Sequence, residues 1–219
     1  MHRICVDVGG TFTDLFGLEP ETGRVFSEKV STTPDAITGV IDALDVCEAP
    51  FDKVSTFIFG STRATNALVE GKVEPVAFLA TEGFTDTLEI RRVWREHLFG
   101  WRWERPKALV PRDLRFGVSG RIDWRGKEIE PLDLTAVDAA VDQIRRRGIR
   151  SVAVSLLFSF RNPEHEHRVR DRIAASAPEL SIYLSSDMNP EVRDYERGST
   201  TVVGASLSSL VQGLFDDLE

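Results

Sequence analysis

The sequence predicts an α/β fold that opens with an antiparallel β-meander and continues with βαβ units. Three observations support this prediction. The chain begins with three strand-like runs separated by turn residues. Later apolar runs are rich in β-branched and aromatic residues, which are enriched in strands. Segments with helix start signals and a helical apolar stripe lie between those runs, and strand–helix–strand order indicates parallel pairing through a crossover.

The meander and the first helix are predicted from the opening of the chain. Strands are expected over Ile4–Val8, Phe12–Leu18 and Arg24–Val30, with turns at the Gly-Gly pair and at "EPETG". A helix should follow, with Thr33 as N-cap, Pro34 at its first position and Asp35 in its first turn. Its apolar stripe is formed by Ile37, Val40, Ile41 and Leu44.

The middle of the chain predicts two βαβ units. The first has strands at Val54–Gly60 and Pro75–Gly83 around a helix at Ser61–Gly71. Residues 84–123 are irregular and are expected to be mostly loop and short elements. A helix in which Thr135 and Asp138 resemble a capping box comes next. The second βαβ unit follows that helix, and it consists of strand Ser151–Phe160, a helix capped by Asn162 and strand Leu180–Ser186. From Thr200 onward a further helical stripe runs to the end.

Composition narrows the class of protein. The 219 residues are 42% hydrophobic and carry a formal net charge of −8, which argues against a nucleic-acid-binding protein. No apolar run approaches a membrane span, and Asp7 interrupts what would be the apolar region of a signal peptide. Cys5 and Cys47 lie in apolar runs, which is typical of buried, reduced thiols. A cytoplasmic globular protein is therefore expected.

The stretch "DVGGTFTD" holds more chemistry than a tight turn needs. Glycines let a backbone approach an anion, and threonine hydroxyls can donate to phosphate oxygens. Aspartates on either side would repel phosphate unless Mg²⁺ lies between them. Neither a Walker sequence nor a dinucleotide fingerprint is present. A decorated hairpin is the structural alternative, but the two aspartates favour a phosphate loop whose candidate residues are Asp7, Gly9, Gly10, Thr11, Thr13 and Asp14.

The same stretch resembles the first phosphate motif of the ATPase superfamily that contains actin and the sugar kinases. Its form is similar to that of the hydantoinase A/5-oxoprolinase family, which includes subunits of acetone and acetophenone carboxylases. Further segments resemble this family in order along the whole chain. They are "GSTRATNALVEGK", "ATEGFTDTLEIRR", "PRDLRFGVSGRIDWRGKEIEPLD", "SVAVSLLFSFRNPEHEHRVRD" and "NPEVRDYERGSTTVVGASL".

The resemblance implies an RNase H-like, actin-like ATPase domain that uses ATP and Mg²⁺. ATP would phosphorylate a carbonyl or enolate oxygen of a small molecule, to drive hydrolysis of a cyclic amide or carboxylation of a ketone. Asp7 would organise Mg²⁺, Gly9–Thr11 would cradle phosphates with Asp14 beside them, and Thr13 would donate to the terminal phosphate. A hydantoinase B-type subunit and an oligomeric assembly are the implied partners.

By the same resemblance, residues 1–188 form the N-terminal-like domain, and residues 189–219 begin the next ATPase domain, which is truncated. The piece alone is then expected to be inactive. The alternative is a non-catalytic interaction or regulatory subunit that lacks a complete nucleotide site.

Other candidates remain open at this point. Family members often have His at the position of Phe59, so a catalytic or substrate-binding role for this position is not expected here. Thr62 and Asn66 match the family and either bind a second anion or only cap a short helix. His97, in the Trp- and Arg-rich segment Arg91–Pro106, is a candidate for a substrate pocket. A loop packed by its own aromatic residues, or a subunit contact, is the slightly favoured alternative. His165 and His167 are expected in a solvated helix turn, and the charged run Arg193–Arg197 in a hinge or interdomain contact.

Overall fold

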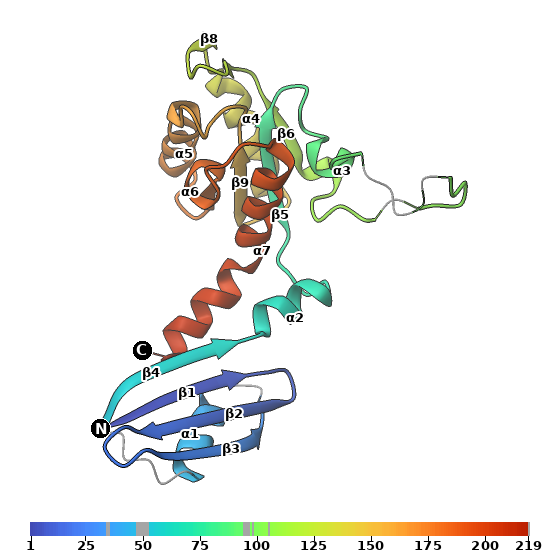
Figure 1. Ribbon diagram of the computed structural model, residues 1–219. Helices are drawn as coiled ribbons and strands as arrows, with labels where there is room; N and C mark the ends of the chain where they lie inside the picture. Colours follow the sequence, from blue (N-terminus) through green and yellow to red (C-terminus); the bar gives the residue numbers. More distant parts are fainter. Residues whose placement is uncertain (34–35, 47–52, 94–96, 98, 105, 219) are drawn as a thin grey trace. The chain divides into compact units, whose positions relative to one another are not determined.

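The computed structural model describes residues 1–33, 36–46, 53–93, 97, 99–104 and 106–218. The chain divides into two units. The first comprises Met1–Val73 together with Leu207–Glu219, and the second is Glu74–Ser206. Pro34, Asp35, Cys47 and Trp94 lie outside the described residues, so the expectations for their side chains stay predictions. Each unit has its own sheet and its own apolar core (Figure 1).

The first unit is built on a four-stranded sheet in the order β3-β2-β1-β4. Its first three strands form the predicted antiparallel meander, and the fourth pairs with β1 in parallel. The bounds of its elements are β1 His2–Val8, β2 Phe12–Glu19, β3 Arg24–Ser31, α1 Ala36–Val46, β4 Val54–Ser61 and α2 Arg63–Val69.

Alternation along β1 and β2 gives this sheet two different faces. Residues Ile4, Val6, Val8 and Leu15 are buried against α1, whose Val40, Ala43 and Leu44 complete the core. Ile41 of the predicted stripe is 44% exposed, because the helix turns it away from that core. Cys5 lies on the opposite face and is exposed, so the expectation of a buried thiol was wrong for this residue.

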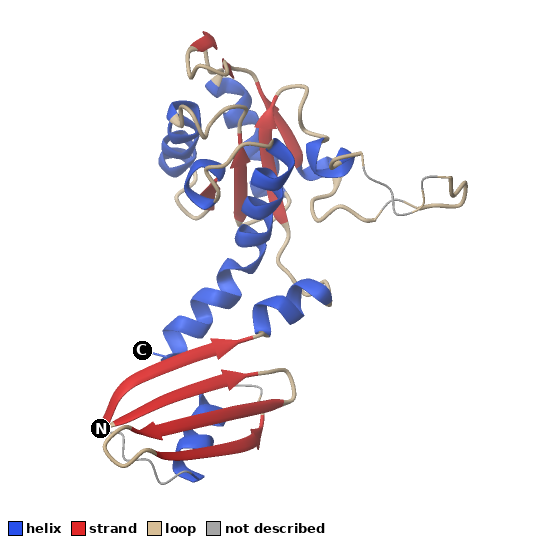
Figure 2. Cartoon of the chain, viewed as in Figure 1, coloured by secondary structure: helices blue, strands red, loops and turns tan. Residues whose placement is uncertain are grey.

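The second unit is built on a parallel sheet in the order β10-β9-β5-β6. Figure 2 shows its strands among helices and long loops. Its strands are β5 Val76–Thr81, β6 Arg115–Val118, β9 Ser151–Ser155 and β10 Ser181–Leu184, with the short pair β7 Arg121–Ile122 and β8 Glu128–Glu130 beside them. Its helical elements are α3 Thr87–Ile90, η2 Arg112–Leu114, α4 Leu134–Arg146, α5 Glu164–Ser176 and α6 Ser185–Met188, and α7 Asp194–Leu218 begins in this unit.

One βαβ prediction is confirmed and the other was wrong. Strands β9 and β10 pair in parallel around α5, as the sequence predicts. Strands β4 and β5 do not pair, because β4 belongs to the first sheet and β5 to the second. Helix α2 therefore leads from one sheet to the other. Strand β6 pairs with β5 inside the segment that was expected to be mostly loop and short elements.

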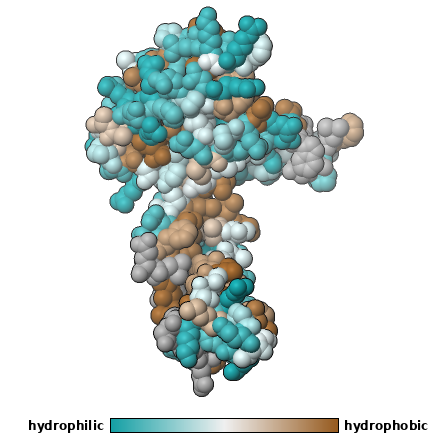
Figure 3. Space-filling view, turned by 60° about the vertical axis from the view of Figure 1, so that its left-hand side comes forward, coloured by the Kyte–Doolittle hydropathy of each residue, from teal (hydrophilic) through white to brown (hydrophobic). Residues whose placement is uncertain are grey.

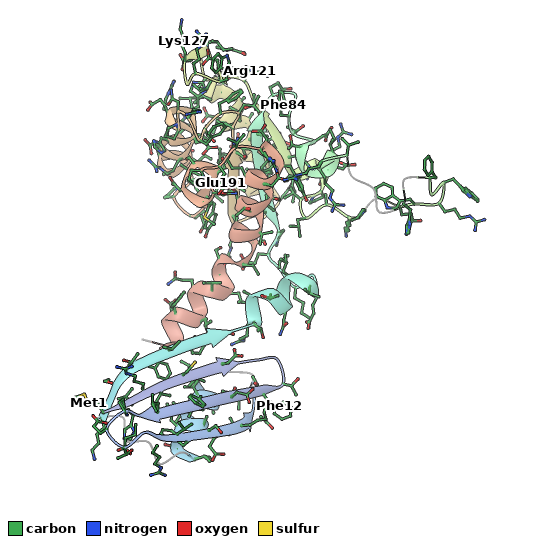
Figure 4. All side chains as sticks on the ribbon, viewed as in Figure 1. Met1, Phe12, Phe84, Arg121, Lys127 and Glu191 are labelled. Carbon is green, nitrogen blue, oxygen red and sulfur yellow. The ribbon has the colours of Figure 1, made fainter. Side chains whose placement is uncertain are left out.

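The core of the second unit lies between its sheet and helices. Strands β5 and β9 are buried along their whole length, which explains their continuous apolar sequences. Apolar residues of α4, α5 and α7 complete the core. On the face shown in Figure 3, the surface of this unit is mostly hydrophilic. Near its β-pair, the guanidinium of Arg121 lies 5.2 Å from the centre of the Phe84 ring (Figure 4).

The helix ends show two departures from the predicted capping. Asp133, not Thr135, is the N-cap of α4, and its carboxylate accepts from the Thr135 amide at 2.8 Å. Asp138 is free for another role and accepts two hydrogen bonds from Arg172 of α5. Asn162 caps α5 as predicted, by accepting from the Glu164 amide at 3.0 Å. None of the described helices is both long and apolar enough to span a bilayer.

Candidate functional site: the β1–β2 hairpin

The turn between β1 and β2 presents backbone N–H groups to solvent. The Gly9 amide closes the turn by donating to the Phe12 carbonyl at 3.0 Å. The next two residues, Gly10 and Thr11, are exposed, and their amides donate to no protein acceptor within the described ranges. Phe12 marks the start of β2 in Figure 4. Successive turn amides are the groups from which anion-binding concavities are built, so the role of these two in holding phosphate stays a prediction.

The two aspartates lie side by side on the exposed face of the sheet. Asp7 and Asp14 are directly opposite in the antiparallel ladder, which places their side chains on the same face. Asp14 forms an ion pair with Lys29 at 2.5 Å. Asp7 lies beside Gly60 of β4, where an added Cβ would be 3.6 Å from its Oδ1 atom. Because Lys29 neutralises Asp14, Asp7 is the carboxylate better placed to attract a cation.

Thr13 lies on the other face of the sheet. Its side chain is completely buried, and its hydroxyl is 3.1 Å from that of Thr32. The Thr32 hydroxyl in turn donates to the Gly9 carbonyl at 3.1 Å. The expected donation from Thr13 to the terminal phosphate stays a prediction. In this structure, Thr13 supports the turn from the buried face of the sheet through its contact with Thr32.

The segment after β4 reaches the same end of the sheet (Figure 1). The Thr62 amide donates to the Val8 carbonyl at 3.2 Å, which ties the start of α2 to the end of β1. An added Cβ on Gly10 would lie 3.1 Å from Nδ2 of Asn66. Asn66 also donates to the Thr62 hydroxyl at 3.5 Å, and Thr62 makes no side-chain capping bond. Thus Thr62 and Asn66 lie next to the hairpin, although they are 51 or more positions away from its turn.

His97 belongs to the other unit. It is exposed and lies beside Gly100, Trp101 and Trp103 at a shallow hollow. The guanidinium of Arg102 stacks 4.3 Å from the centre of the Trp101 ring. Because Trp101 is 84% exposed, the described part of the segment shows little packing of this ring. The roles in a substrate pocket and in a self-packed loop both stay predictions.

A metal at this site would depend on few protein ligands. Among the described residues, no group of three or more His, Cys, Asp or Glu side chains is close enough to hold a metal ion. Mg²⁺ bound to a nucleotide commonly uses one or two carboxylates, with phosphate oxygens and water as its other ligands. The exposed Asp7 carboxylate, on the strand that leads into the turn, fits that coordination pattern.

The sequence interpretation missed a buried polar cluster in the second unit. Arg197 and Glu166 are both fully buried. Arg197 donates to the Leu156 carbonyl, to the Ser185 hydroxyl and to Asp194. Glu166 accepts from the Ser185 hydroxyl at 2.6 Å and from two backbone amides. A charged run that begins a helix gave no sign of this burial.

His165 is a second correction. The expected solvated turn was wrong for this residue, which is only 2% exposed. Its Nε2 atom lies 2.6 Å from a carboxylate oxygen of Glu128, so the side chain ties α5 to the strand pair. The identities of neighbouring residues in the sequence do not indicate this partner, which comes from 37 positions away.

Comparison with known proteins identifies the family. Residues 3–176 match the family model described as the hydantoinase/oxoprolinase N-terminal region. The chain belongs to this family. It is 36% identical over 235 residues to the caprolactamase subunit alpha of Pseudomonas jessenii, covering 99% of this chain and 34% of that protein. It is 31% identical to the acetophenone carboxylase gamma subunit of Aromatoleum aromaticum, covering 97% and 32% respectively.

A solved structure agrees with this membership of the hydantoinase/oxoprolinase family. The crystal structure of the ATP-dependent caprolactamase from Pseudomonas jessenii superposes with a TM-score of 0.83 at 35% identity. The match covers 99% of this chain and 34% of that one. The chain therefore spans about a third of the length of these relatives, which are named as subunits of larger enzymes.

Proposed function

We propose that this chain is the N-terminal part of an ATP-dependent enzyme of the hydantoinase/oxoprolinase type. The enzyme would phosphorylate a carbonyl or enolate oxygen to drive hydrolysis of a cyclic amide or carboxylation of a ketone. The observation that carries the proposal is the hairpin, whose turn has exposed Gly10 and Thr11 amides and whose first strand carries the exposed Asp7 carboxylate. Relatives named as an ATP-dependent caprolactamase and as a carboxylase subunit support the class of reaction.

Each residue has a role in this proposal. Gly10 and Thr11 donate backbone N–H groups to phosphate oxygens, and Asn66 lies close enough to Gly10 to add a side-chain amide. Asp7 orients the hydrated metal. Thr13 acts as a positioning residue, because its bond to Thr32 holds the turn from the buried side. Bound Mg²⁺ would offset the negative charge of the transferring phosphoryl group.

The topology of the first unit supports the finer assignment to an RNase H-like, actin-like ATPase fold. Three antiparallel strands followed by a fourth that is parallel to the first form the opening of such a sheet. The complete ATPase, a B-type partner subunit and an oligomeric assembly are parts of the same proposal. We propose the cytoplasm as the place where such an enzyme acts.

The test is ATP-dependent turnover of the complete gene product with its partner subunit. Asp7→Asn keeps the size of the side chain but removes the charge that orients the metal. We expect a loss of about 10- to 100-fold in turnover, which is typical when a group that orients a metal through its bound water is removed. If Asp7→Asn lowers the affinity for Mg²⁺, added Mg²⁺ should restore part of the lost turnover.

The matched control is Asp42→Asn, the same chemical change on the exposed side of α1 in the same unit. It should leave turnover and the circular dichroism spectrum unchanged. Equal turnover of Asp7→Asn and the unmodified enzyme would overturn the role of Asp7. Absence of nucleotide binding by the complete protein would instead support a non-catalytic subunit.

A further inference from the structure

The second unit contains a pocket that is separate from the hairpin and that no role described so far uses. It lies between α3, the first turns of α7 and the segment 106–109. Its volume is about 150 Å³. Apolar atoms of Leu88, Leu109 and Val202 line it, together with the Tyr195 side chain. A cavity of this size holds a molecule about as large as benzene. We call it the Tyr195 pocket.

Positive charge gathers at this pocket. Among the residues that the structure describes, Arg91 and Lys107 belong to its lining and no acidic residue does. A second, more open hollow shares Arg91 and Tyr195 with it and adds Arg92 and Arg193. The combined lining therefore has four cationic residues and two acidic ones, an excess of two positive charges. This excess stands out in a chain whose formal net charge is −8.

The two acidic residues of the hollow are already engaged by arginines. Glu196 accepts a hydrogen bond from Arg92, and Asp194 accepts one from the buried Arg197 at 2.7 Å. Burial acts to raise the pKa of Glu196, but hydrogen bonds from its own backbone and from Arg92 hold that pKa below its usual value. Glu196 thus stays ionised and paired near neutral pH, and Asp194 is also paired. Among the described residues of the lining, cationic side chains outnumber acidic ones.

The backbone around the pocket is held in an unfavourable conformation. Arg91, Val93 and Arg193 have φ angles of 58°, 59° and 89°, in the region that favours glycine. Phe158 is the other such residue in the described part of the chain. Conformations of this kind are costly and gather at ligand-binding and catalytic sites. Two of the three strained residues here carry guanidinium groups that line the hollow.

We propose that the Tyr195 pocket binds a small organic carboxylate with an apolar body. The body, a ring or a short chain, occupies the cavity between Leu88, Leu109 and Val202. The carboxylate faces Arg91, Arg193 and Lys107, because planar guanidinium groups match carboxylate oxygens in shape and charge. The apolar wall distinguishes this site from one for inorganic phosphate. The proposal does not depend on nucleotide binding at the hairpin.

The test compares ligands of equal shape and different charge. The probes are benzoate and hexanoate against benzamide and hexanamide, titrated into the full chain by calorimetry and by ligand-observed NMR. We expect at least one carboxylate to bind about tenfold or more tightly than its neutral amide, the gain expected from a charge-assisted hydrogen bond. Added salt should weaken only the carboxylate. Equal binding of each pair, or no binding of any probe, overturns the proposal.

Variants locate the site. Arg193→Gln should weaken carboxylate binding about tenfold and leave amide binding little changed. Arg91→Gly removes a guanidinium and places glycine at a φ of 58°, so it deletes the charge without adding backbone strain. The matched control is Arg146→Gln, on the exposed end of α4 and outside the lining, which should bind every probe as the unmodified chain does.

Further outcomes separate this proposal from the others. Asp7→Asn should leave carboxylate binding intact, so that failure of the hairpin as a nucleotide site would not affect the result. Inorganic phosphate should compete poorly with benzoate. If phosphate competes as well as benzoate does, the site is for simple anions, and the assignment to an organic carboxylate is wrong. Unchanged carboxylate affinity in both arginine variants would also overturn it.

Discussion

At the scale of single residues, alternation along a strand separates neighbours that the sequence groups together. Thr13 and Asp14 are adjacent in one motif, yet Thr13 is completely buried and Asp14 is exposed beside Lys29. The Thr32 hydroxyl gives its proton to the Gly9 carbonyl, so Thr13 must be the donor in the bond to Thr32. The exposed members of the motif are the ones that we propose to contact a nucleotide directly.

Replacing Thr13 with valine tests this positioning role. Thr13→Val keeps the shape of the side chain but removes the hydroxyl that donates to Thr32. We expect a loss of about 1 kcal/mol in the free energy of unfolding, the usual value of one such bond. Urea denaturation followed by circular dichroism measures it. Thr11→Val, at an exposed position, should change stability much less. Equal losses in the two variants would contradict the structural role.

At the scale of elements, helices and strands are joined by polar contacts that the sequence does not predict. Helices α4 and α5 are linked by Arg172, which donates to both carboxylate oxygens of Asp138 at 2.7 and 2.6 Å. The hydrogen bond from Arg172 holds the pKa of Asp138 below its usual value of 3.8. The carboxylate is thus more acidic in the folded protein than in the unfolded chain.

This link predicts a pH dependence of stability. Because folding lowers the pKa of Asp138, its contribution is fully present above the unfolded value and is lost as pH falls through the lower, folded value. Asp138→Asn should therefore destabilise the protein at pH 7 by a small amount and make less difference in strongly acidic solution. Thermal unfolding of both proteins across that range measures the difference.

The control for this experiment is Asp142→Asn, on the exposed surface of the same helix. It should change stability little, and equally at both ends of the pH range. High salt should reduce the effect of Asp138→Asn at pH 7, because the pair is exposed to solvent. If Asp138→Asn lowered the stability by the same amount in acid and at neutral pH, the result would show that Arg172 does not stabilise the ionised form of Asp138.

At the scale of the whole molecule, the two units differ in how much apolar surface they bury. The described core of the second unit contains 27 buried apolar residues, and that of the first contains seven. Burial of apolar surface is the main source of stability, and local unfolding begins where such burial is small. The unit that carries the hairpin is therefore the less protected one.

Hydrogen exchange on the intact chain tests this difference. Amides of β5 and β9, which are buried along their whole length, should exchange slowest. Amides of β3, an edge strand whose residues are mostly exposed, should exchange much faster. Mass spectrometry of peptides from each strand measures both rates. Exchange in β2 and β3 as slow as in β9 would contradict the expected order.

Several features of this protein are present in its sequence alone. The three-strand meander, the buried strands β5 and β9, the strand β10 and the cap of α5 follow from local pattern, because periodicity and capping depend on neighbours in the chain. The hairpin motif and the family were also recognisable there. Each of these features depends on a short segment of the chain, so the residues of that segment are enough to predict it.

Other features were decided only by the tertiary structure. No local pattern shows that β4 and β5 enter different sheets, or that β6 pairs with β5. The burial of Arg197, the contact of His165 with Glu128 and the approach of Asn66 to Gly10 each join distant positions. Such contacts depend on how strands associate across the chain, because long-range pairing selects partners that no single segment specifies.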